Sequence, residues 1–269
     1  MNMSNSSSGW NGPHSPIPVE DVWREFVRLV GGQVVEDLVP EPRTFSNADF
    51  IFSDVEVVAE LKEVETEFSN NKAFAVGFEA MMNRLILENP EWMPAEFSGN
   101  GQLPNWFGEE FVRLFRPPIS RILKKANLQI RETKEHFGFR SPSGILIFVN
   151  DGFTALEPHF VHRLLCNLLA NSYSSIDCFI YLTVNRYVES NANDLANLLW
   201  IATYSDRADE RLVDFVDALG GKWLDFLEAK IGPFTERLIV PHSEAQDIRM
   251  RPIRLPSEPP LNSFAKRGV

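Results

Sequence analysis

Cysteine and histidine are scarce in this chain, which limits the disulfides and metal sites that it can form. Among 269 residues there are two cysteines, Cys166 and Cys178, and five histidines. Both cysteines lie in apolar surroundings, and the sequence has no zinc-finger spacing and no H-E-x-x-H motif. We therefore expect buried, reduced thiols, no disulfide framework and no zinc.

Long apolar runs and glycine-rich phosphate-binding loops are also missing. No apolar stretch approaches the roughly 18 to 20 residues that span a bilayer, and residues 1–14 lack the basic start and apolar stretch of an export signal. The glycine pairs at 31–32 and 220–221 fit neither G-x-x-x-x-G-K-S/T nor G-x-G-x-x-G. These absences predict a cytoplasmic protein with no membrane association and no nucleotide cofactor.

A surplus of positive charge is lacking as well, because the formal net charge is -11. A nucleic acid would therefore be attracted only by a local basic patch. The one basic region of any length, from 113 to 140, has eight basic residues against two acids: Arg113, Arg116, Arg121, Lys124, Lys125, Arg131, Lys134 and Arg140. Taken alone, such a run is typical of the solvated face of an amphipathic helix.

Material for a hydrophobic core is ample, since 44% of the residues are hydrophobic and 12% are aromatic. Residues 1–17 are rich in Ser, Asn, Gly and Pro, which predicts a disordered tail. We expect an α/β core at 18–184 with an insertion at about 70–115. Residues 185–240 are expected to form a helical extension packed on that core, and 241–269 a proline-rich tail.

Hydrophobic periodicity predicts the elements of this core. Helices are expected from Pro18 to a stop at Gly31-Gly32, and at about 71–88, 108–116, 119–137, 157–170, 191–204 and 208–230, with breaks at Pro117-Pro118 and Gly220-Gly221. Strands are expected at 33–39, 48–53, 55–65, 144–150, 176–184 and 236–241. The apolar run 144–150 should be central and parallel to 176–184, because a helix connects the two.

The stretch NADFIFSDVEVVAELKEVETEF, residues 47–68, has the pattern of two strands but carries seven carboxylates and one lysine. If the strands form an antiparallel hairpin, Asp49 and Glu60 approach each other across the ladder. Lys62 then shares the face of Glu60, because side chains alternate along a strand.

Two converging carboxylates form a hard oxygen site suited to Mg²⁺ or Mn²⁺. The backbone carbonyl of Leu61 would add a third metal ligand, next to Asp49 and Glu60. Lys62 would orient a water for attack on a phosphodiester, while the metal offsets the charge on the phosphate. The sequence thus predicts catalytic roles for Asp49, Glu60 and Lys62.

Asp49, eleven intervening residues and then Glu60-Leu61-Lys62, placed between an amphipathic helix and later apolar strands, resemble the PD-(D/E)XK superfamily of restriction endonuclease-like nucleases. The resemblance covers residues 18–184 and implies a mixed central sheet flanked by helices, with Asp49 as the first acid, Glu60 as the second and Lys62 as the lysine. The proline usually found before the first acid is Ala48 here.

The resemblance also suggests partners for this centre. It implies an accessory acid on the first helix, either Glu20 or Glu25, and a polar or basic residue on the helix after the third strand, either Gln129 or Lys134. With the basic region, it implies that Lys124, Lys125, Gln129, Arg131 and Lys134 bind DNA or RNA. Cutting both strands of a duplex would make a homodimer convenient.

Two other interpretations stay open. The first is a catalytically inactive module of the same fold that binds nucleic acid or a protein. The second is an interaction scaffold in which Glu56, Glu60 and Lys62 form only a solvated strand face, opposite a buried face of valine, alanine and leucine.

Overall fold

The computed structural model describes residues 14–42, 44–65, 71–92, 103–153, 156, 158–170, 172–190, 193–237 and 250–252. The predicted N-terminal tail and the predicted C-terminal tail lie largely outside these residues. Ile17, at the end of the first tail, is held by two hydrogen bonds between its backbone and the side chain of Asn185.

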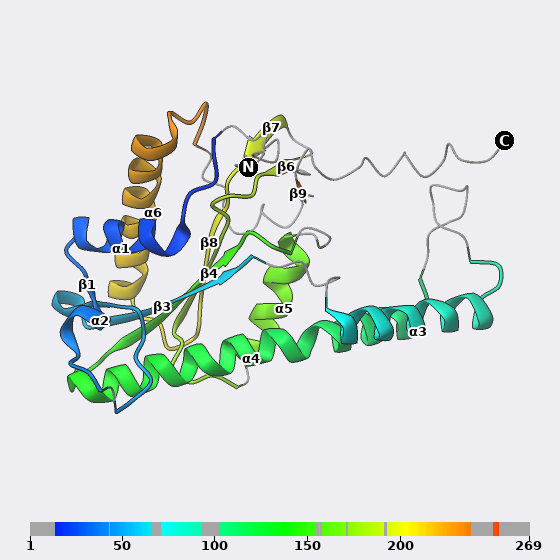
Figure 1. The fold of residues 1–269 in the computed structure, drawn as a ribbon, viewed down its shortest axis with the longest axis horizontal. Helices are drawn as coiled ribbons and strands as arrows, with labels where there is room; N and C mark the ends of the chain where they lie inside the picture. The colour runs from blue at the N-terminus through cyan, green and yellow to red at the C-terminus, as the bar shows by residue number, and fades with distance from the viewer. Residues whose placement is uncertain are drawn as a thin grey trace, which may run out of the picture.

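A six-stranded mixed sheet in the order β1-β2-β3-β4-β5-β8 is the centre of the fold (Figure 1). Its strands are β1 (Gln33–Val34), β2 (Phe50–Phe52), β3 (Val57–Val64), β4 (Ser143–Asn150), β5 (Cys178–Leu182) and β8 (Trp200–Tyr204). The first three strands pair antiparallel, β3, β4 and β5 are parallel, and β8 is antiparallel to β5. The mixed α/β class and the parallel pair of apolar strands are confirmed.

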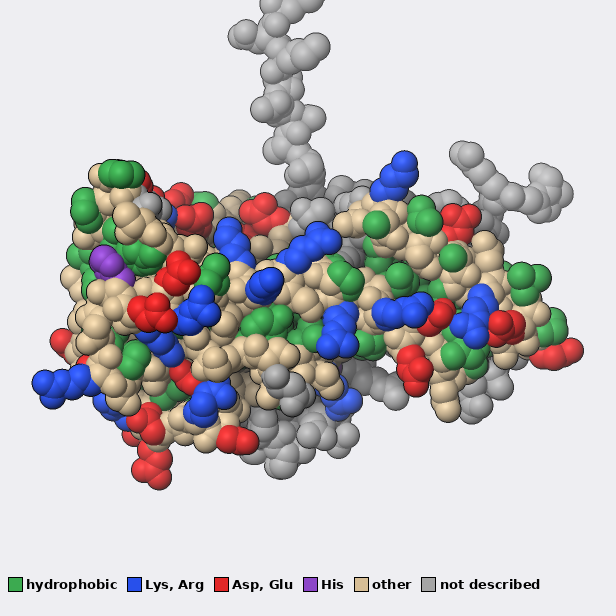
Figure 2. Space-filling view, turned by 90° about the horizontal axis from the view of Figure 1, so that it is seen from below, with side chains coloured by type: hydrophobic (Ala, Val, Ile, Leu, Met, Phe, Trp, Pro, Cys, Tyr) green, Lys and Arg blue, Asp and Glu red, His purple; other side chains and the backbone are tan. Residues whose placement is uncertain are grey.

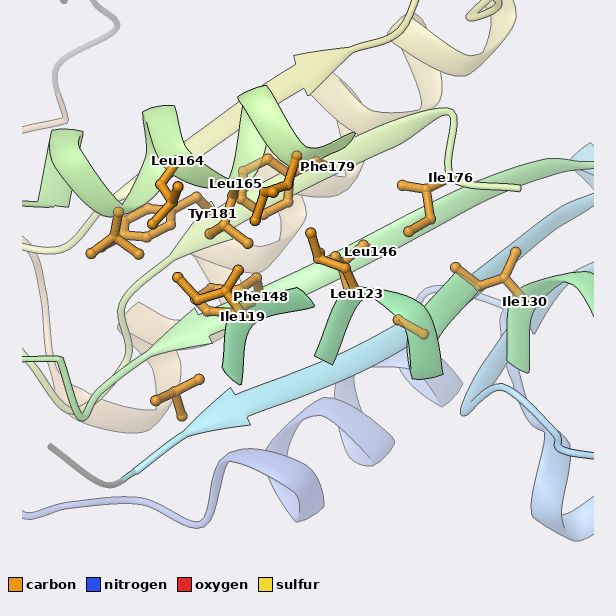
Figure 3. Close-up of a cluster of buried hydrophobic side chains, with 14 of the residues drawn as sticks. Ile119, Leu123, Ile130, Leu146, Phe148, Leu164, Leu165, Ile176, Phe179 and Tyr181 are labelled. Carbon is orange, nitrogen blue, oxygen red and sulfur yellow. The ribbon is translucent and has the colours of Figure 1, made fainter. Parts of the chain in front are cut away.

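Helices cover both faces of this sheet. Helices α1 (Val19–Leu29) and α6 (Glu210–Ile231) pack on one face, and α4 (Asn105–Phe137) and α5 (Pro158–Ala170) pack on the other (Figure 1). The alternation of side chains along a strand separates the two cores. On the α4 side, Ile119 and Leu123 of α4 pack against Leu146 and Phe148 of β4 (Figure 3).

A smaller three-stranded sheet contains β6 (Val188–Ser190), β7 (Asn193–Asn197) and β9 (Met250–Pro252). The predicted helix at 71–88 is present as α3 (Lys72–Glu88). It packs along the N-terminal part of α4, with Met81, Leu85 and Phe107 at the centre of their shared core. Figure 1 shows this pair of helices projecting beyond the sheet. None of the helices in the described part of the chain is long and apolar enough to cross a membrane.

The predicted strand at 33–39 and the predicted hairpin turn are partly corrected. Only Gln33–Val34 is strand, and Val35–Leu38 forms the short helix α2. Strands β2 and β3 pair as expected, but a single 3-10 turn, η1 (Ser53–Val55), and Glu56 in the left-handed region join them.

The predicted break at Pro117-Pro118 is wrong, because α4 continues through both prolines as one helix of 33 residues. A proline removes a hydrogen bond from the helix interior. However, the flanking Phe115 and Ile119 are 2% and 0% exposed, so burial of these side chains maintains the helix across the prolines. The predicted end of this helix at residue 137 is confirmed, and Gly138 follows it with φ 62° in the left-handed region.

The predicted helix at 191–204 is also wrong, since β7 and β8 occupy it. The β8 sequence WIATY is rich in aromatic and β-branched residues, which suit a half-buried strand. Residues 185–240 therefore are not a purely helical extension, because β8 completes the central sheet. Of the predicted strand at 236–241, residues 236–237 are not strand and the remainder lies outside the described residues.

The predicted interruption of α6 at Gly220-Gly221 does not occur. Gly220 is buried against β8, where an added Cβ would lie 2.8 Å from the Nε1 atom of Trp200. A Cβ on Gly221 would meet no atom within 4 Å. Gly220 therefore permits close packing of α6 on the sheet, while Gly221 has no such role.

This contrast predicts opposite effects of two neighbouring substitutions. Gly221→Ala should raise the free energy of unfolding by up to about 1 kcal/mol, because alanine favours a helix. Gly220→Ala should lower it by about 1–3 kcal/mol, because the new methyl group displaces Trp200. Urea unfolding at pH 7 would measure both, and equal effects of the two variants would contradict the packing argument.

Candidate active site

Asp49 and Glu60 meet where β2 begins and β3 continues. The β2–β3 ladder pairs Ile51 with Val58 and Phe50 with Ala59, so the next residues in register are Asp49 and Glu60. Directly opposite residues of an antiparallel pair have their side chains on the same face. The predicted approach of these two carboxylates is therefore present in the structure, on the sheet face that α4 covers.

The position of Asp49 is fixed by two hydrogen bonds. Its Oδ2 accepts a bond of 2.8 Å from the N–H of Leu61, and its carbonyl accepts one of 2.9 Å from the N–H of Val35. The N–H and C=O of one strand residue point to the same side. The Leu61 carbonyl therefore points toward the side of β3 where Asp49 lies.

Glu60 is a carboxylate buried completely inside the protein, at 0% exposure. Its Oε1 accepts a hydrogen bond from the Nζ atom of Lys62, and the two form an ion pair. Its Oε2 is buried and receives no hydrogen bond from a donor group among the described residues. A hydrogen bond joins the Glu60 and Asp49 carboxyl groups only while one of them keeps a proton. An unsatisfied buried oxygen of this kind is costly unless something binds it.

Burial changes the proton affinity of both acids. Burial first and the charge of Asp49 second raise the pKa of Glu60 to about 8, against the opposing effect of Lys62. The pKa of Asp49 is raised too, again chiefly by burial, while its bond from Leu61 and the charge of Lys62 act in the opposite direction. In the absence of a cation, burial therefore favours the neutral form of these carboxyl groups, while Lys62 favours the charged form.

A cavity of about 170 Å³ opens next to Asp49, between α1 and α4. It is lined by residues that include Glu20 and Arg24 of α1, Asn47 and Gln129. The charge of Glu20 also raises the pKa of Asp49. The structure thus places Glu20 near Asp49.

The other proposed accessory acid, Glu25, lies elsewhere. Its Oε2 is 2.7 Å from the Nζ of Lys230 in an exposed ion pair. Of the two acids predicted from α1, only Glu20 lines the cavity.

Helix α4 holds the loop that precedes Asp49. The N–H groups of Ser46 and Ala48 donate to side chains of α4, and the carbonyl of Asn47 accepts from one. The three contacts are Ser46 N to Glu132 Oε2 at 2.6 Å, Gln129 Nε2 to Asn47 O at 2.8 Å, and Ala48 N to Thr133 Oγ1 at 2.7 Å. Gln129 also has its buried Oε1 without a partner among the described residues.

The innermost of these contacts requires a residue with a backbone N–H at position 48. A proline at position 48 has no N–H and would leave the hydroxyl of Thr133 without its donor. Sequence reasoning missed Thr133 and Glu132, because a polar residue on a helix does not indicate which distant loop it will contact. The only signal was the spacing of Gln129, Glu132 and Thr133, which places them on one helix face.

The predicted basic residues divide into two groups. Lys124, Lys125 and Arg131 are exposed on α4, and Figure 2 shows Lys and Arg side chains interspersed with acids on the face that this helix presents. Lys134 is instead turned inward. Its Nζ donates to Ser175 O at 3.0 Å and to Asp177 Oδ2 at 3.1 Å, and burial lowers its pKa. Lys134 therefore joins α4 to the start of β5 and is not available to a phosphate.

Comparison with known proteins gives no family for this chain. No family model matches it, and no curated protein and no solved structure is significantly similar to it. Within the part of the chain that the structure describes, no group of three or more His, Cys, Asp or Glu side chains is arranged to hold a metal. The function must therefore be argued from the carboxylate pair, the lysine and their surroundings.

The raised pKa of Glu60 predicts how stability depends on pH. The pKa is about 8 in the folded protein and near 4.5 ordinarily, so the folded state holds the proton more tightly. This contribution to stability is complete below pH 4.5 and is lost as pH rises toward and through about 8. Glu60→Gln, which needs no proton, should therefore become increasingly more stable than the wild type between pH 5 and 8 without metal.

Urea unfolding in EDTA across that pH range would measure the difference. The matched control is Glu56→Gln, because hydrogen bonds from Ser141 and Arg140 lower the pKa of that exposed carboxylate. The contribution of Glu56 to the free energy of unfolding is present above the ordinary pKa of a glutamate and is lost as pH falls. A Glu60→Gln difference that stays constant with pH would show that Glu60 is not buried as a neutral acid.

Proposed function

We propose that this protein is a divalent-metal-dependent nuclease of the PD-(D/E)XK type that hydrolyses phosphodiester bonds in nucleic acid. The observation that carries the proposal is the convergence of Asp49 and Glu60 beside Lys62, with one buried oxygen of Glu60 that receives no hydrogen bond from a donor group among the described residues. Two acids and a lysine in this arrangement suit hydrolysis better than a structural ion pair, which would satisfy all of its oxygens.

The order of the elements also supports the proposal. Helix α1, the antiparallel strands β1, β2 and β3, helix α4 and the parallel strand β4 fit the mixed central sheet flanked by helices that the resemblance implies. Helix α3 and the N-terminal part of α4 occupy the predicted insertion. A catalytically inactive module of the same fold would have the same topology. Stabilisation by Mn²⁺ distinguishes the two, because only the nuclease should bind the cation.

The residues present fit Mg²⁺ or Mn²⁺. Asp49 and Glu60 would supply carboxylate oxygens, and Leu61 its backbone carbonyl, which are the hard ligands that these cations prefer. Magnesium usually keeps several waters and is held by one or two carboxylates plus phosphate oxygens, so a third acidic ligand is not required. When bound, the cation would polarise the phosphate and lower the pKa of an attacking water.

Side chains of the protein would orient the attacking water and bind the substrate. Lys62 donates to Glu60 and is largely enclosed, at 18% side-chain exposure, and it would orient the water that attacks the phosphodiester. Glu20 and Gln129, across the cavity, would accept and donate hydrogen bonds to that water or to the substrate. Lys124, Lys125 and Arg131 would bind the phosphate backbone along α4.

Catalysis should depend on Glu60 and not on Glu25. Replacing Glu60 by Gln should reduce cleavage of a mixture of DNA and RNA substrates in Mn²⁺ by more than about 100-fold, because even groups beyond a metal's direct ligands contribute about 10–100-fold. Glu20→Gln should cause a loss of about 10–100-fold. Glu25→Gln, which alters only the pair with Lys230, should cleave as the wild type does.

The same variants separate the nuclease from an inactive module. Mn²⁺ should raise the Tm of the wild type but not that of Glu60→Gln, because a ligand stabilises only the state that binds it. Cleavage retained in Glu60→Gln would refute the proposed centre. A wild type without cleavage and without stabilisation by Mn²⁺ would favour the inactive module.

Nucleic-acid binding should distinguish the exposed lysines from the buried one. Lys124→Ala and Lys125→Ala should weaken binding at low salt, and each should reduce the slope of log affinity against log salt by about 1. Lys134→Met should lower the free energy of unfolding, because it leaves Asp177 short of a partner, but should keep the wild-type slope. Filter binding between 50 and 200 mM salt would test this, and equal slopes for all three variants would contradict the assignment.

A further inference from the structure

The loop before Asp49 is attached to α4 by three hydrogen bonds that differ in burial. Ser46 bonds to Glu132 near the surface, Asn47 to Gln129 in a partly buried position, and Ala48 to Thr133 in the interior. Ala48 and Thr133 are both 0% exposed. Water cannot readily replace a bond in such a place, so the innermost contact constrains the backbone most strongly.

We propose that Thr133 is a positioning residue for the candidate metal site. Gln129 and Glu132 support it through their own hydrogen bonds to the same loop. The inference rests on the nuclease function proposed above. The Thr133 hydroxyl fixes the backbone at Ala48, immediately before Asp49, and so sets the direction in which the Asp49 carboxylate points.

The bonds on either side of Asp49 show how this control operates. Ala48 is held by Thr133 on the α4 side, and the Asp49 carbonyl is held by Val35 on the side of β1. With the backbone fixed at both points, the carboxylate reaches the N–H of Leu61 and faces Glu60. Loss of the Thr133 bond frees one of the two points, and the carboxylate then leaves Leu61.

The hydrogen bond from Ala48 to Thr133 restrains the backbone before Asp49, as the ring of a proline at that position would. A proline restricts its own φ and the conformation of the residue before it. Alanine at position 48 has neither restriction, and α4 supplies the constraint from outside the loop. Helix α4 would thus orient the first metal ligand from its inner face while its exposed residues meet the nucleic acid.

Thr133→Val, which keeps the shape but removes the hydroxyl, tests the inference with two measurements. The first is hydrogen exchange of the Leu61 amide, which should lose its protection when Asp49 moves away. The second is calorimetric titration with MnCl₂ at pH 8, in which the affinity should fall about 10–100-fold, as for other groups that orient metal ligands.

The matched control is Asn127→Ala on the same helix. Asn127 Oδ1 accepts from the N–H of Ser175 at 2.9 Å, so this variant breaks a similar bond to a loop that carries no site residue. It should leave both Leu61 protection and Mn²⁺ affinity unchanged. Thr133→Ser, which retains the hydroxyl, should behave as the wild type in both measurements.

The outcomes are distinct. Unchanged Leu61 protection in folded Thr133→Val overturns the positioning role, whatever the metal does. If the wild type does not bind Mn²⁺, the proposed function fails, while the exchange of Leu61 still decides whether Thr133 orients Asp49. If Thr133→Val does not fold, Glu132→Ala removes the outermost bond without emptying the core and should reduce Leu61 protection to a smaller extent. Wild-type protection in that variant would then overturn the role.

Discussion

The hydrogen bond from the Leu61 N–H to the Asp49 carboxylate joins the sheet to the candidate centre. Strand β2 begins at Phe50, and β3 continues past Ala59, the partner of Phe50, so an N–H group of β3 would otherwise have no strand partner. A side-chain oxygen takes the place of the missing backbone carbonyl. The same bond satisfies the backbone and brings a carboxylate beside Glu60, so the architecture of the sheet edge and the chemistry of the site have one origin.

The second constraint is the burial of Glu60. An acid without solvent in an α/β core is destabilising unless it is neutral, paired or bound to a cation. Here Lys62 reaches one oxygen and burial favours the proton on the carboxyl group. A proton and the lysine therefore compete for the same carboxylate, and under the proposed function a cation would compete with both.

Periodicity identified the elements whose burial pattern is local. The apolar run at 144–150 and the amphipathic pattern at 18–30 became β4 and α1, because every residue that decides them lies within the element. The predictions for Pro117-Pro118 and for residues 191–204 are wrong, because distant contacts determine the secondary structure of these segments. The core holds α4 together at the prolines, and pairing with β5 makes 200–204 a strand.

In the candidate site, too, the sequence predicts relations set by local contacts but not those set by distant ones. Asp49 and Glu60 could be brought together from the sequence, because hairpin pairing and side-chain alternation fix their relation. Lys134 could not be assigned correctly, since its partner Asp177 is 43 residues away along the chain. The contacts of Gln129, Glu132 and Thr133 with residues 46–48 span more than 80 residues, and only the folded chain shows them.

The length of α4 has a consequence for how this protein can change. At about 1.5 Å per residue, its 33 residues extend for about 50 Å, and the residues that contact the Asp49 loop lie only in its C-terminal third. The other end, with α3, forms a separate small core beyond the sheet. Insertions or deletions there would alter the outline of the molecule without shifting the carboxylates. The projecting helices are thus the part of the fold in which sequence changes during evolution are best tolerated. The carboxylates are positioned by the opposite, C-terminal end of α4.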